Sequence, residues 1–556
     1  NCQGTGGKNV IVTGGTYNAD INRQHWSDEV FVPETHYTAN NGDGTYTIKE
    51  GAEAYVNTGM LTGPYYYRKN IGYATLEEAV KAAVDFKDSP VGLNQDVTLE
   101  ETVIINGNGD EMELVIDLNE HTITGTATAK PTAFRIQNNA NVIVKNGNIN
   151  TENYNFILGA SDATSAGNLT IESGKFHGTT SVVSVTKGHL NITGGEFSVE
   201  PYQGNYAYLI NCIDANYNNE TAKVAISGGT FHNWNPQDNA AETGGHANFC
   251  ASGYGAVETS TGVWEVVPMQ GITLHPGWNW FSSYINIEGE EGLETLQNAL
   301  AGNATIIKSQ SSSFTSYSEN GSWYGELNSL SIEEMYMIEM SNAHTLSLTG
   351  DIVDPSTVNI TLKQGWNWIG YPFSDANAVK DVVKGVMGDN DQVKSHKEGF
   401  AEYFNGNWYG SLKTLKPGQG YMYGNKDGEH QFTYTIPAPG AKSELRANVT
   451  AENNRWVPAS SQFVNNMTMV AMVDGVNADS YEVAAFVNGE VRGSARPIYI
   501  EPLDAYMLFL TIYGDEVEEM TFRYYDLTTG EEYALDDRIN YSNDARVGSI
   551  AEPYIF

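Results

Sequence analysis

The chain has 556 residues, too many for one compact core, so several domains of about 100–200 residues each are expected. Its 68 acidic and 30 basic residues give a net charge of −38, and this acidic balance excludes a nucleic-acid partner, which needs a basic footprint. Because the sequence is rich in Tyr and Gly and has no run of about 18 apolar residues, we expect short strands joined by glycine turns and no transmembrane segment.

The N-terminal segment has the pattern of short aromatic strands. Residues 10–17 read VIVTGGTY, and aromatic residues then recur up to a strand pattern that ends at Ile48. We interpret residues 1–70 as the tail or cap of an upstream β-helix-like module. Cys2 lies in this segment and could carry a lipid anchor, or it could be an ordinary cysteine of a longer chain.

An eight-residue pattern then recurs: apolar, any, apolar, any two, Gly, any, apolar. Its copies read VIVKNGNI at 142–149, LTIESGKF at 169–176, LNITGGEF at 190–197 and VAISGGTF at 224–231, and a looser copy, IDLNEHTI, occupies 116–123. From the looser copy onward, the copies start 26, 27, 21 and 34 residues apart, which is typical of the coils of a parallel β-helix. The first, third and eighth positions alternate inward. A buried ladder is therefore predicted for Val144, Ile171, Ile192 and Ile226.

Both ends of this repeat region have features of a cap. The segment 73–84, YATLEEAVKAAV, predicts an amphipathic helix that covers the open end of the first coils. After the last coil, the passage from Phe231 to Trp264 repeats the passage from Tyr17 to Tyr46.

The repeated tail, the Gly-Gly-Thr-aromatic signature and the run Asn-Pro-Gln-Asp-Asn-Ala at 235–240 resemble the coils and end caps of bacterial and phage β-helix proteins. The resemblance implies a right-handed parallel β-helix over residues 71–268, with the helix as its N-terminal cap.

A longer repeat occupies the middle of the chain. GWNWFSSY at 277–284 returns as GWNWIGYP at 365–372, 88 residues later, and many further anchors match at nearly fixed offsets. Each copy carries one predicted helical segment, near 290–301 and near 376–387. The repeat resembles the Gly-Trp-Asn-Trp modules of large surface and secreted proteins from Bacteroidetes. It predicts two domains of one fold, residues 269–357 and 358–437.

The C-terminal part begins after a linker rich in Pro, Ala and Gly at 436–448. Residues 449–556 alternate between apolar and polar positions and contain hairpin turns, so a β-sandwich is predicted there. The runs at 482–495 and 522–533 resemble a C-terminal module of Bacteroidetes extracellular proteins. The predicted fold class is thus all-β: a parallel β-helix, two tandem modules and a C-terminal β-sandwich.

The coils offer one place where catalysis could occur. The repeat places Lys145 opposite Glu172, and Lys175 opposite Glu196, on coils about 4.8 Å apart. We interpret these as cross-strand pairs that hold the register. A polysaccharide lyase or hydrolase would need a base or two carboxylates at such a position. Because the sequence contains no His-Glu-x-x-His motif and no column of three carboxylates, we assign no catalytic residue and predict that the protein is not an enzyme.

No cofactor and no metal site are expected. The turns at 106–111 and 388–391 offer oxygen ligands, but neither has the twelve-residue loop with a terminal Glu that binds calcium. We interpret them as ordinary Asn-Gly turns, with Ca²⁺ as the alternative.

The aromatic residues of the two modules are the candidates for ligand binding. The tryptophans of the repeated motif are interpreted as module core, because aromatic side chains dominate core energetics, and the alternative is a glycan-binding face: Trp278, Trp280, Trp366 and Trp368. A second set lies next to a glycine turn, where exposed rings could stack on sugars: Trp323, Tyr324, Trp408 and Tyr409.

From these patterns and resemblances we expect a non-enzymatic, adhesin-like protein at the cell surface or secreted, which binds a glycan or a protein on another cell or matrix. The alternatives are a carbohydrate-active enzyme with its site on the β-helix and a purely structural surface stalk.

Overall fold

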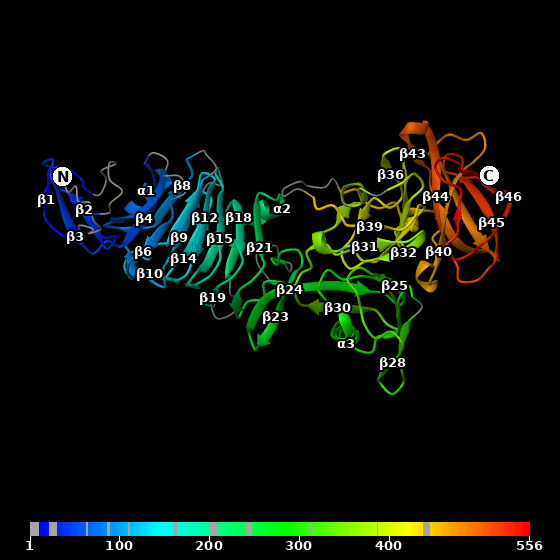
Figure 1. Cartoon of the computed structure of the whole chain (residues 1–556), viewed down its shortest axis with the longest axis horizontal. Helices are drawn as coiled ribbons and strands as arrows, with labels where there is room; N and C mark the ends of the chain where they lie inside the picture. The colour runs from blue at the N-terminus through cyan, green and yellow to red at the C-terminus, as the bar shows by residue number, and fades with distance from the viewer. Residues whose placement is uncertain are drawn as a thin grey trace. The chain divides into compact units, whose positions relative to one another are not determined.

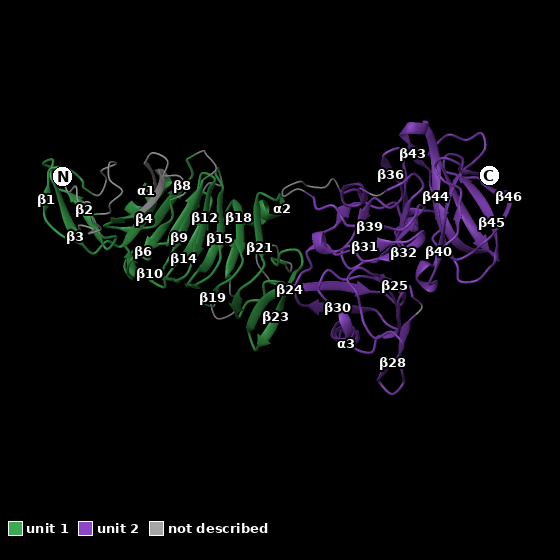
Figure 2. Cartoon of the chain, in the orientation of Figure 1, with its two compact units in different colours: residues 1–267 green, residues 268–556 purple. Residues whose placement is uncertain are grey.

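In the computed structural model, the chain is mostly β (Figure 1). It divides into two compact units, residues 1–267 and 268–556, which are described separately (Figure 2). No helix in the described part of the chain is long and apolar enough to cross a membrane. The structure describes residues 11–21, 31–62, 65–85, 89–108, 112–160, 164–200, 208–239, 247–311, 313–385, 387–437 and 445–556, with backbone only for 59–69 and 85.

Unit 1 is built on three sheets whose strands run parallel, and each turn of the chain adds one strand to each sheet. The first sheet contains β6 (Val91–Leu93), β9 (Glu113–Asp117), β12 (Ala140–Lys145), β15 (Gly167–Ile171), β18 (Gly188–Ile192) and β21 (Ala222–Ile226). The second contains β7 (Val97–Leu99), β10 (Thr122–Gly125), β13 (Asn148–Thr151), β16 (Lys175–Gly178), β19 (Glu196–Val199) and β22 (Thr230–His232). The third contains β8 (Val103–Asn106), β11 (Phe134–Gln137), β14 (Tyr154–Leu158), β17 (Ser181–Val185) and β20 (Ile210–Cys212).

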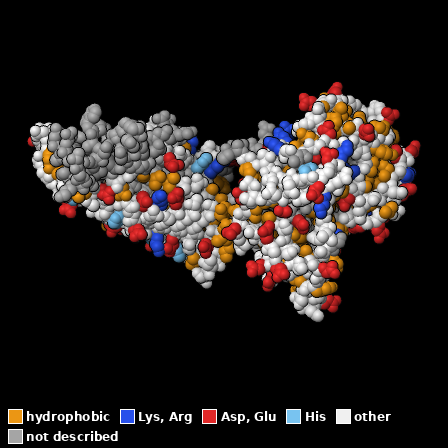
Figure 3. All heavy atoms as spheres, in the orientation of Figure 1, with side chains coloured by type: hydrophobic (Ala, Val, Ile, Leu, Met, Phe, Trp, Pro, Cys, Tyr) orange, Lys and Arg blue, Asp and Glu red, His pale blue; other side chains and the backbone are white. Residues whose placement is uncertain are grey.

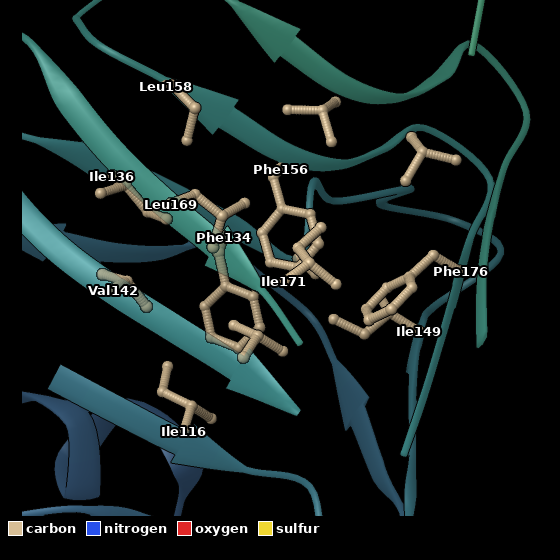
Figure 4. Close-up of a cluster of buried hydrophobic side chains, with 14 of the residues drawn as sticks. Ile116, Phe134, Ile136, Val142, Ile149, Phe156, Leu158, Leu169, Ile171 and Phe176 are labelled. Atoms are coloured by element: carbon tan, nitrogen blue, oxygen red, sulfur yellow. The ribbon is translucent and has the colours of Figure 1, made fainter. Parts of the chain in front are cut away.

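The interior of the stacked coils is a set of apolar ladders. Ile171 pairs with Ile192, which pairs with Ile226, and all three side chains are fully buried, so the predicted ladder is confirmed. On the second sheet the rings of Phe176 and Phe197 stack with their centroids 5.3 Å apart. Figure 4 shows side chains from all three sheets pointing into this shared interior.

Glycine makes the sharp corner between the first and second sheets. Gly174 has a φ of +119°, which residues other than glycine rarely adopt. A Cβ at this position would also lie 2.4 Å from the carbonyl oxygen of Gly147 in the preceding coil, so the close approach of the two coils requires glycine. The register predicted for the looser copy at 116–123 is wrong by two residues. Leu114 and Ile116, rather than Ile116 and Leu118, are its inward pair, because the corner of this coil is two residues longer.

Antiparallel strands and a helix precede the coils. The helix α1 (Leu76–Asp85) confirms the amphipathic prediction: it contacts β8 and buries Leu76, Ala79, Val80 and Ala83. β5 runs across the predicted division at 70/71, so the segments on both sides share one sheet and one compact unit. The preceding strands are β1 (Thr16–Tyr17), β2 (His36–Asn40), β3 (Tyr46–Glu50), β4 (Ala54–Thr62) and β5 (Tyr65–Tyr73).

The N-terminal strands have the same pattern of hydrogen bonds as the strands that come after the last coil. Tyr17 pairs with Tyr46 in the way that Phe231 pairs with Trp264. The amide of Ile48 donates to the carbonyl oxygen of Gly15, as the amide of Val266 does to that of Gly229. The region after the last coil contains β23 (Tyr254–Ser260) and the first residues of β24 (Val263–Leu274), and the short helix α2 (Asp214–Asn218) lies between β20 and β21.

Unit 2 contains two five-stranded antiparallel sheets with the same order of equivalent strands. The first is β25 (Gly277–Phe281), β29 (Tyr336–Met340), β26 (Ala304–Lys308), β27 (Phe314–Tyr317) and β28 (Trp323–Gly325). The second is β32 (Gly365–Ile369), β38 (Tyr421–Asn425), β34 (Gln392–Lys394), β35 (Phe400–Phe404) and β36 (Asn407–Gly410).

Smaller elements complete these two sheets. In the first copy the helix α3 (Gly289–Ala299) forms nearly as predicted at 290–301. In the second copy, a helix predicted at 376–387 is reduced to α4 (Val379–Val382), because the four β-branched valines and Gly385 of this segment disfavour a longer helix. The remaining strands are β30 (His344–Thr349), β31 (Ile360–Leu362), β33 (Asn377–Ala378), β37 (Thr414–Leu415) and β39 (His430–Phe432), with η1 (Pro355–Thr357).

The last part of unit 2 consists of two sheets that share one apolar core. One contains β43 (Ile498–Ile500), β44 (Ala505–Tyr513), β40 (Asn466–Met472), β47 (Arg546–Val547) and β48 (Tyr554–Ile555). The other contains β42 (Glu490–Ala495), β41 (Tyr481–Val487), β45 (Glu519–Asp526) and β46 (Glu532–Asn540). The short helices are η2 (Ala451–Asn453), η3 (Ser460–Gln462) and η4 (Glu501–Leu503).

Candidate functional site

The asparagine of the Gly-Trp-Asn-Trp motif has a structural role in both copies. The Nδ2 of Asn279 donates to the carbonyl oxygens of His275 and Gly277, at 2.7 and 3.0 Å. The Nδ2 of Asn367 donates to the equivalent oxygens of Lys363 and Gly365, at 2.8 and 3.0 Å. These bonds hold the turn that precedes the strand, so the presence of asparagine in both copies has a structural reason that involves no ligand.

The four tryptophans of the motif lie in one cluster together with methionines, rather than in the separate core of each module. The indole Nε1 of Trp280 donates to the carbonyl oxygen of Val464 at 3.4 Å, and that of Trp366 donates to Asp544 at 2.7 Å. The prediction that they form module core is therefore corrected. They join the two modules and the C-terminal sheets, with Trp280 buried and the other three half-buried.

The four predicted ligand residues lie in two different environments. Tyr324 is 62% exposed, and Trp323 is half-buried against Tyr317, with ring centroids 5.2 Å apart. Their equivalents differ: Trp408 is buried, and its indole Nε1 donates to the carbonyl oxygen of a valine at 3.1 Å. We therefore withdraw Trp408 as a stacking surface, since its ring packs inside the module. Tyr409 is half-buried.

Tyr409 lines a cavity of about 340 Å³ within unit 2, a volume in the range of small-ligand sites. Trp408, Asn407 and Leu412 also contribute to its wall. Tyr499, which is 45% exposed, lies on another part of the wall, and its hydroxyl donates to Asp504 at 2.7 Å. The cavity also has charged residues in its lining: Lys380, Lys413, Arg446 and Glu501.

Backbone hydrogen bonds bring the basic segments to this cavity. The amide of Val379 donates to the carbonyl oxygen of Lys413 at 3.0 Å, which places the start of α4 beside residue 413. The side chain of Asn448 accepts from the Lys413 amide at 2.7 Å. The hydroxyl of Thr414 donates to the carbonyl oxygen of Arg446 at 2.8 Å, so residues 446–448 are held against β37.

Electrostatics at the cavity are unusual for so acidic a chain. Burial lowers the pKa of the Lys413 ammonium, and the positive charge of Arg446 lowers that pKa further. Within the part of the chain that the structure describes, no ion pair joins Lys380, Lys413 or Arg446 to a carboxylate. The cavity can therefore offer positive charge and aromatic surface to one ligand.

Sequence reasoning selected Tyr409 and missed the basic residues and Tyr499. Lys380, Lys413 and Arg446 lie on separate segments, and no motif links them. The local signal that was available is the pair of lysines in Ser-Leu-Lys-Thr-Leu-Lys at 411–416, which stands out in a chain with 30 basic residues.

The charged pairs on the coils are cross-strand contacts, as predicted. Lys145 lies 3.9 Å from Glu172, and Lys175 lies 2.8 Å from Glu196. Hydrogen bonds from Lys175 and then from His232 lower the pKa of the Glu196 carboxyl, so Glu196 is poorly suited to act as a general acid.

The turn at 388–391 uses its acidic side chains in internal hydrogen bonds. Asp391 accepts from the hydroxyl of Tyr423 at 2.8 Å and from the amide of Lys426 at 2.9 Å. The turn at 106–111 and Cys2 lie partly or wholly outside the described residues. No group of three or more His, Cys, Asp or Glu side chains that could hold a metal ion occurs among the residues described.

No known family model matches the chain, and no curated protein does. Among solved structures, the chain is 12% identical to gamma-CGTase from alkalophilic Bacillus clarkii, covering 52% of this chain and 36% of that chain, with a TM-score of 0.10.

Proposed function

We propose that this chain is a non-enzymatic, adhesin-like protein that binds a glycan in the cavity beside Tyr409. The observation that carries the proposal is that two tyrosine rings, Tyr409 and Tyr499, line a cavity large enough for a sugar. Aromatic rings provide large, rigid contact area with a polar tip, which suits a ligand with both apolar and hydroxyl surface. The resemblance of the repeat to Bacteroidetes modules supports a location at the cell surface or in the secreted fraction.

We further propose that unit 1 is a right-handed parallel β-helix that serves as a rigid spacer. Two features support this: the strands of its coils pair in parallel in three sheets, and crossover connections between parallel strands are almost always right-handed. Each coil contacts only its neighbours, and ladders of buried apolar side chains link the coils along the stack.

A glycan array probed with the whole chain tests the binding proposal. We expect binding to a defined group of saccharides that is lost in Tyr499→Ala, which removes an exposed ring without disturbing a core. Tyr324→Ala is the matched control, because Tyr324 is the sequence equivalent of Tyr409 but does not line the cavity.

An array with no bound saccharide, or binding that survives Tyr499→Ala and Tyr409→Ala, contradicts the proposal. Release of shortened products from a bound polysaccharide, lost in Lys145→Ala or Glu172→Ala, favours the enzyme instead.

A further inference from the structure

We infer that the cavity beside Tyr409 selects an acidic saccharide, a sugar that carries a carboxylate or a sulfate. This inference rests on the proposed function, because it assumes that the occupant is a sugar. It adds the chemical class of that sugar, which the aromatic rings alone do not define.

The first support is the convergence of positive charge. The cavity is lined by Lys380, Lys413 and Arg446, from three segments, and by a single carboxylate, that of Glu501, among its described lining residues. The chain as a whole has 68 acidic and 30 basic residues, and acidic side chains also outnumber basic ones on the face in Figure 3. Basic residues therefore outnumber acidic ones around this cavity, although acidic residues predominate in the chain as a whole.

The second support is that this arrangement is unfavourable for the fold itself. Lys413 is half-buried, and the charge of Arg446 acts against its protonated form, so burial and repulsion both lower its pKa. The nearby Lys416, by contrast, has a carboxylate partner in Glu398 at 2.6 Å. An anion in the cavity would provide the missing partner.

The side chains suit distinct parts of an acidic sugar. The guanidinium of Arg446 can donate two parallel hydrogen bonds to a carboxylate or sulfate, and the ammonium of Lys413 can act as a point charge beside it. The tyrosine rings are available to the sugar ring, and the carboxylate of Glu501 can accept hydrogen bonds from hydroxyls. The strong net negative charge of the chain disfavours a long polyanion, so a short saccharide or the end of a chain fits best.

Isothermal titration of the full chain with three probes tests the inference. The probes are trigalacturonate, its fully methyl-esterified form, which has the same rings without the charge, and a sulfated chondroitin disaccharide. We expect an acidic probe to bind at least about tenfold more tightly than the ester, with affinity that falls as salt rises. The preferred acidic probe shows whether carboxylate or sulfate is recognised.

Two variants and one control separate charge recognition from sugar recognition. Lys413→Met and Arg446→Met should each weaken the acidic probe about tenfold and leave the ester unchanged. Lys384→Met is the matched control, because Lys384 is an exposed lysine just after α4 that does not line the cavity. Thermal melting of each variant checks that it is folded.

Equal affinity for acid and ester, weakened for both in Tyr499→Ala, overturns the inference but leaves glycan binding intact. Binding of inorganic sulfate as tight as that of the acidic sugars also overturns it, because the cavity would then bind anions without recognising a sugar. The absence of binding by all three probes overturns it as well. The glycan array then decides separately whether the proposed function fails.

Discussion

The Nζ of Lys394 lies 4.3 Å from the ring centroid of Trp366, and the equivalent Lys308 lies 4.7 Å from the ring of Trp278. Both copies of the repeat therefore place an ammonium over the first tryptophan of the motif. The second copy has a further contact: Lys394 is fully buried, and its Nζ lies 2.7 Å from Asp544 of the C-terminal part. The repeated motif thus anchors the last sheets to the second module.

The substitution Asp544→Asn should destabilise unit 2 by about 3 kcal/mol, because it leaves a buried ammonium without its counterion. Asn tolerates the positive φ of 60° at this position, so the backbone is not the cause. Chemical denaturation measures the loss. The double substitution Lys394→Met with Asp544→Asn should recover most of it, and no recovery would show that Asp544 acts in another way.

Acid should weaken unit 2 through His396. Burial lowers the pKa of this imidazole from 6.5 to about 3, and its Nε2 donates to the carbonyl oxygen of Phe463 at 2.9 Å. The unfolded chain therefore binds a proton that the folded chain excludes, and stability falls as pH drops from 6.5 toward 3. One pKa unit corresponds to about 1.4 kcal/mol, so about 2 kcal/mol should be lost between pH 6.5 and pH 5.

Denaturation of unit 2 as a function of pH measures this effect. In the variant His396→Phe, which keeps a ring against Trp280, the same pH interval should cost about 2 kcal/mol less than in the parent chain. The same pH dependence in both proteins would assign the acid sensitivity to carboxylates.

The substitution Ile192→Asp should unfold the coils and spare unit 2. Ile192 is fully buried between Ile171 and Ile226, so an unpaired carboxylate there costs several kcal/mol. Limited proteolysis should then remove unit 1 and leave a resistant fragment that starts near residue 268, because unit 2 has its own cores. Digestion of the whole chain would show that the two units depend on each other for stability.

The two equivalent tryptophans should differ in their contribution to stability. Trp408 is buried and hydrogen-bonded, so Trp408→Ala should cost about 3–5 kcal/mol. Trp323 is half-buried on the strand β28, and Trp323→Ala should cost about 1 kcal/mol. Equal decreases in melting temperature would contradict this prediction, because they would mean that both rings contribute equally to stability.

The coils could be predicted from sequence because their determinants are local. Inward positions alternate within each strand, and the corner glycine follows at a fixed distance, as in Leu169 to Phe176. The third sheet could not be predicted in the same way. Its strands, such as β11 and β14, occur in loops of variable length and have no fixed offset from the glycine.

The repeat of the two modules could also be predicted from the sequence, but the different burial of equivalent residues in the two copies could not. Identical motifs gave no sign that Phe314 is 47% exposed whereas its equivalent Phe400 is fully buried against Phe509. That difference arises because the C-terminal sheets cover only the second copy of this position. The charged lining of the cavity was hidden for a related reason, since tertiary contacts alone bring its segments together.

The ladders of unit 1 have a fixed spacing from one coil to the next. Val142, Leu169 and Leu190 occupy the same position in successive coils, so a chain lacking residues 169–189 would place Leu190 directly against Val142 and keep every other pairing. Such a loss shortens the stack by one strand spacing, about 4.8 Å. Gene duplication or deletion of single coils would therefore change the length of this stack and leave unit 2 unchanged.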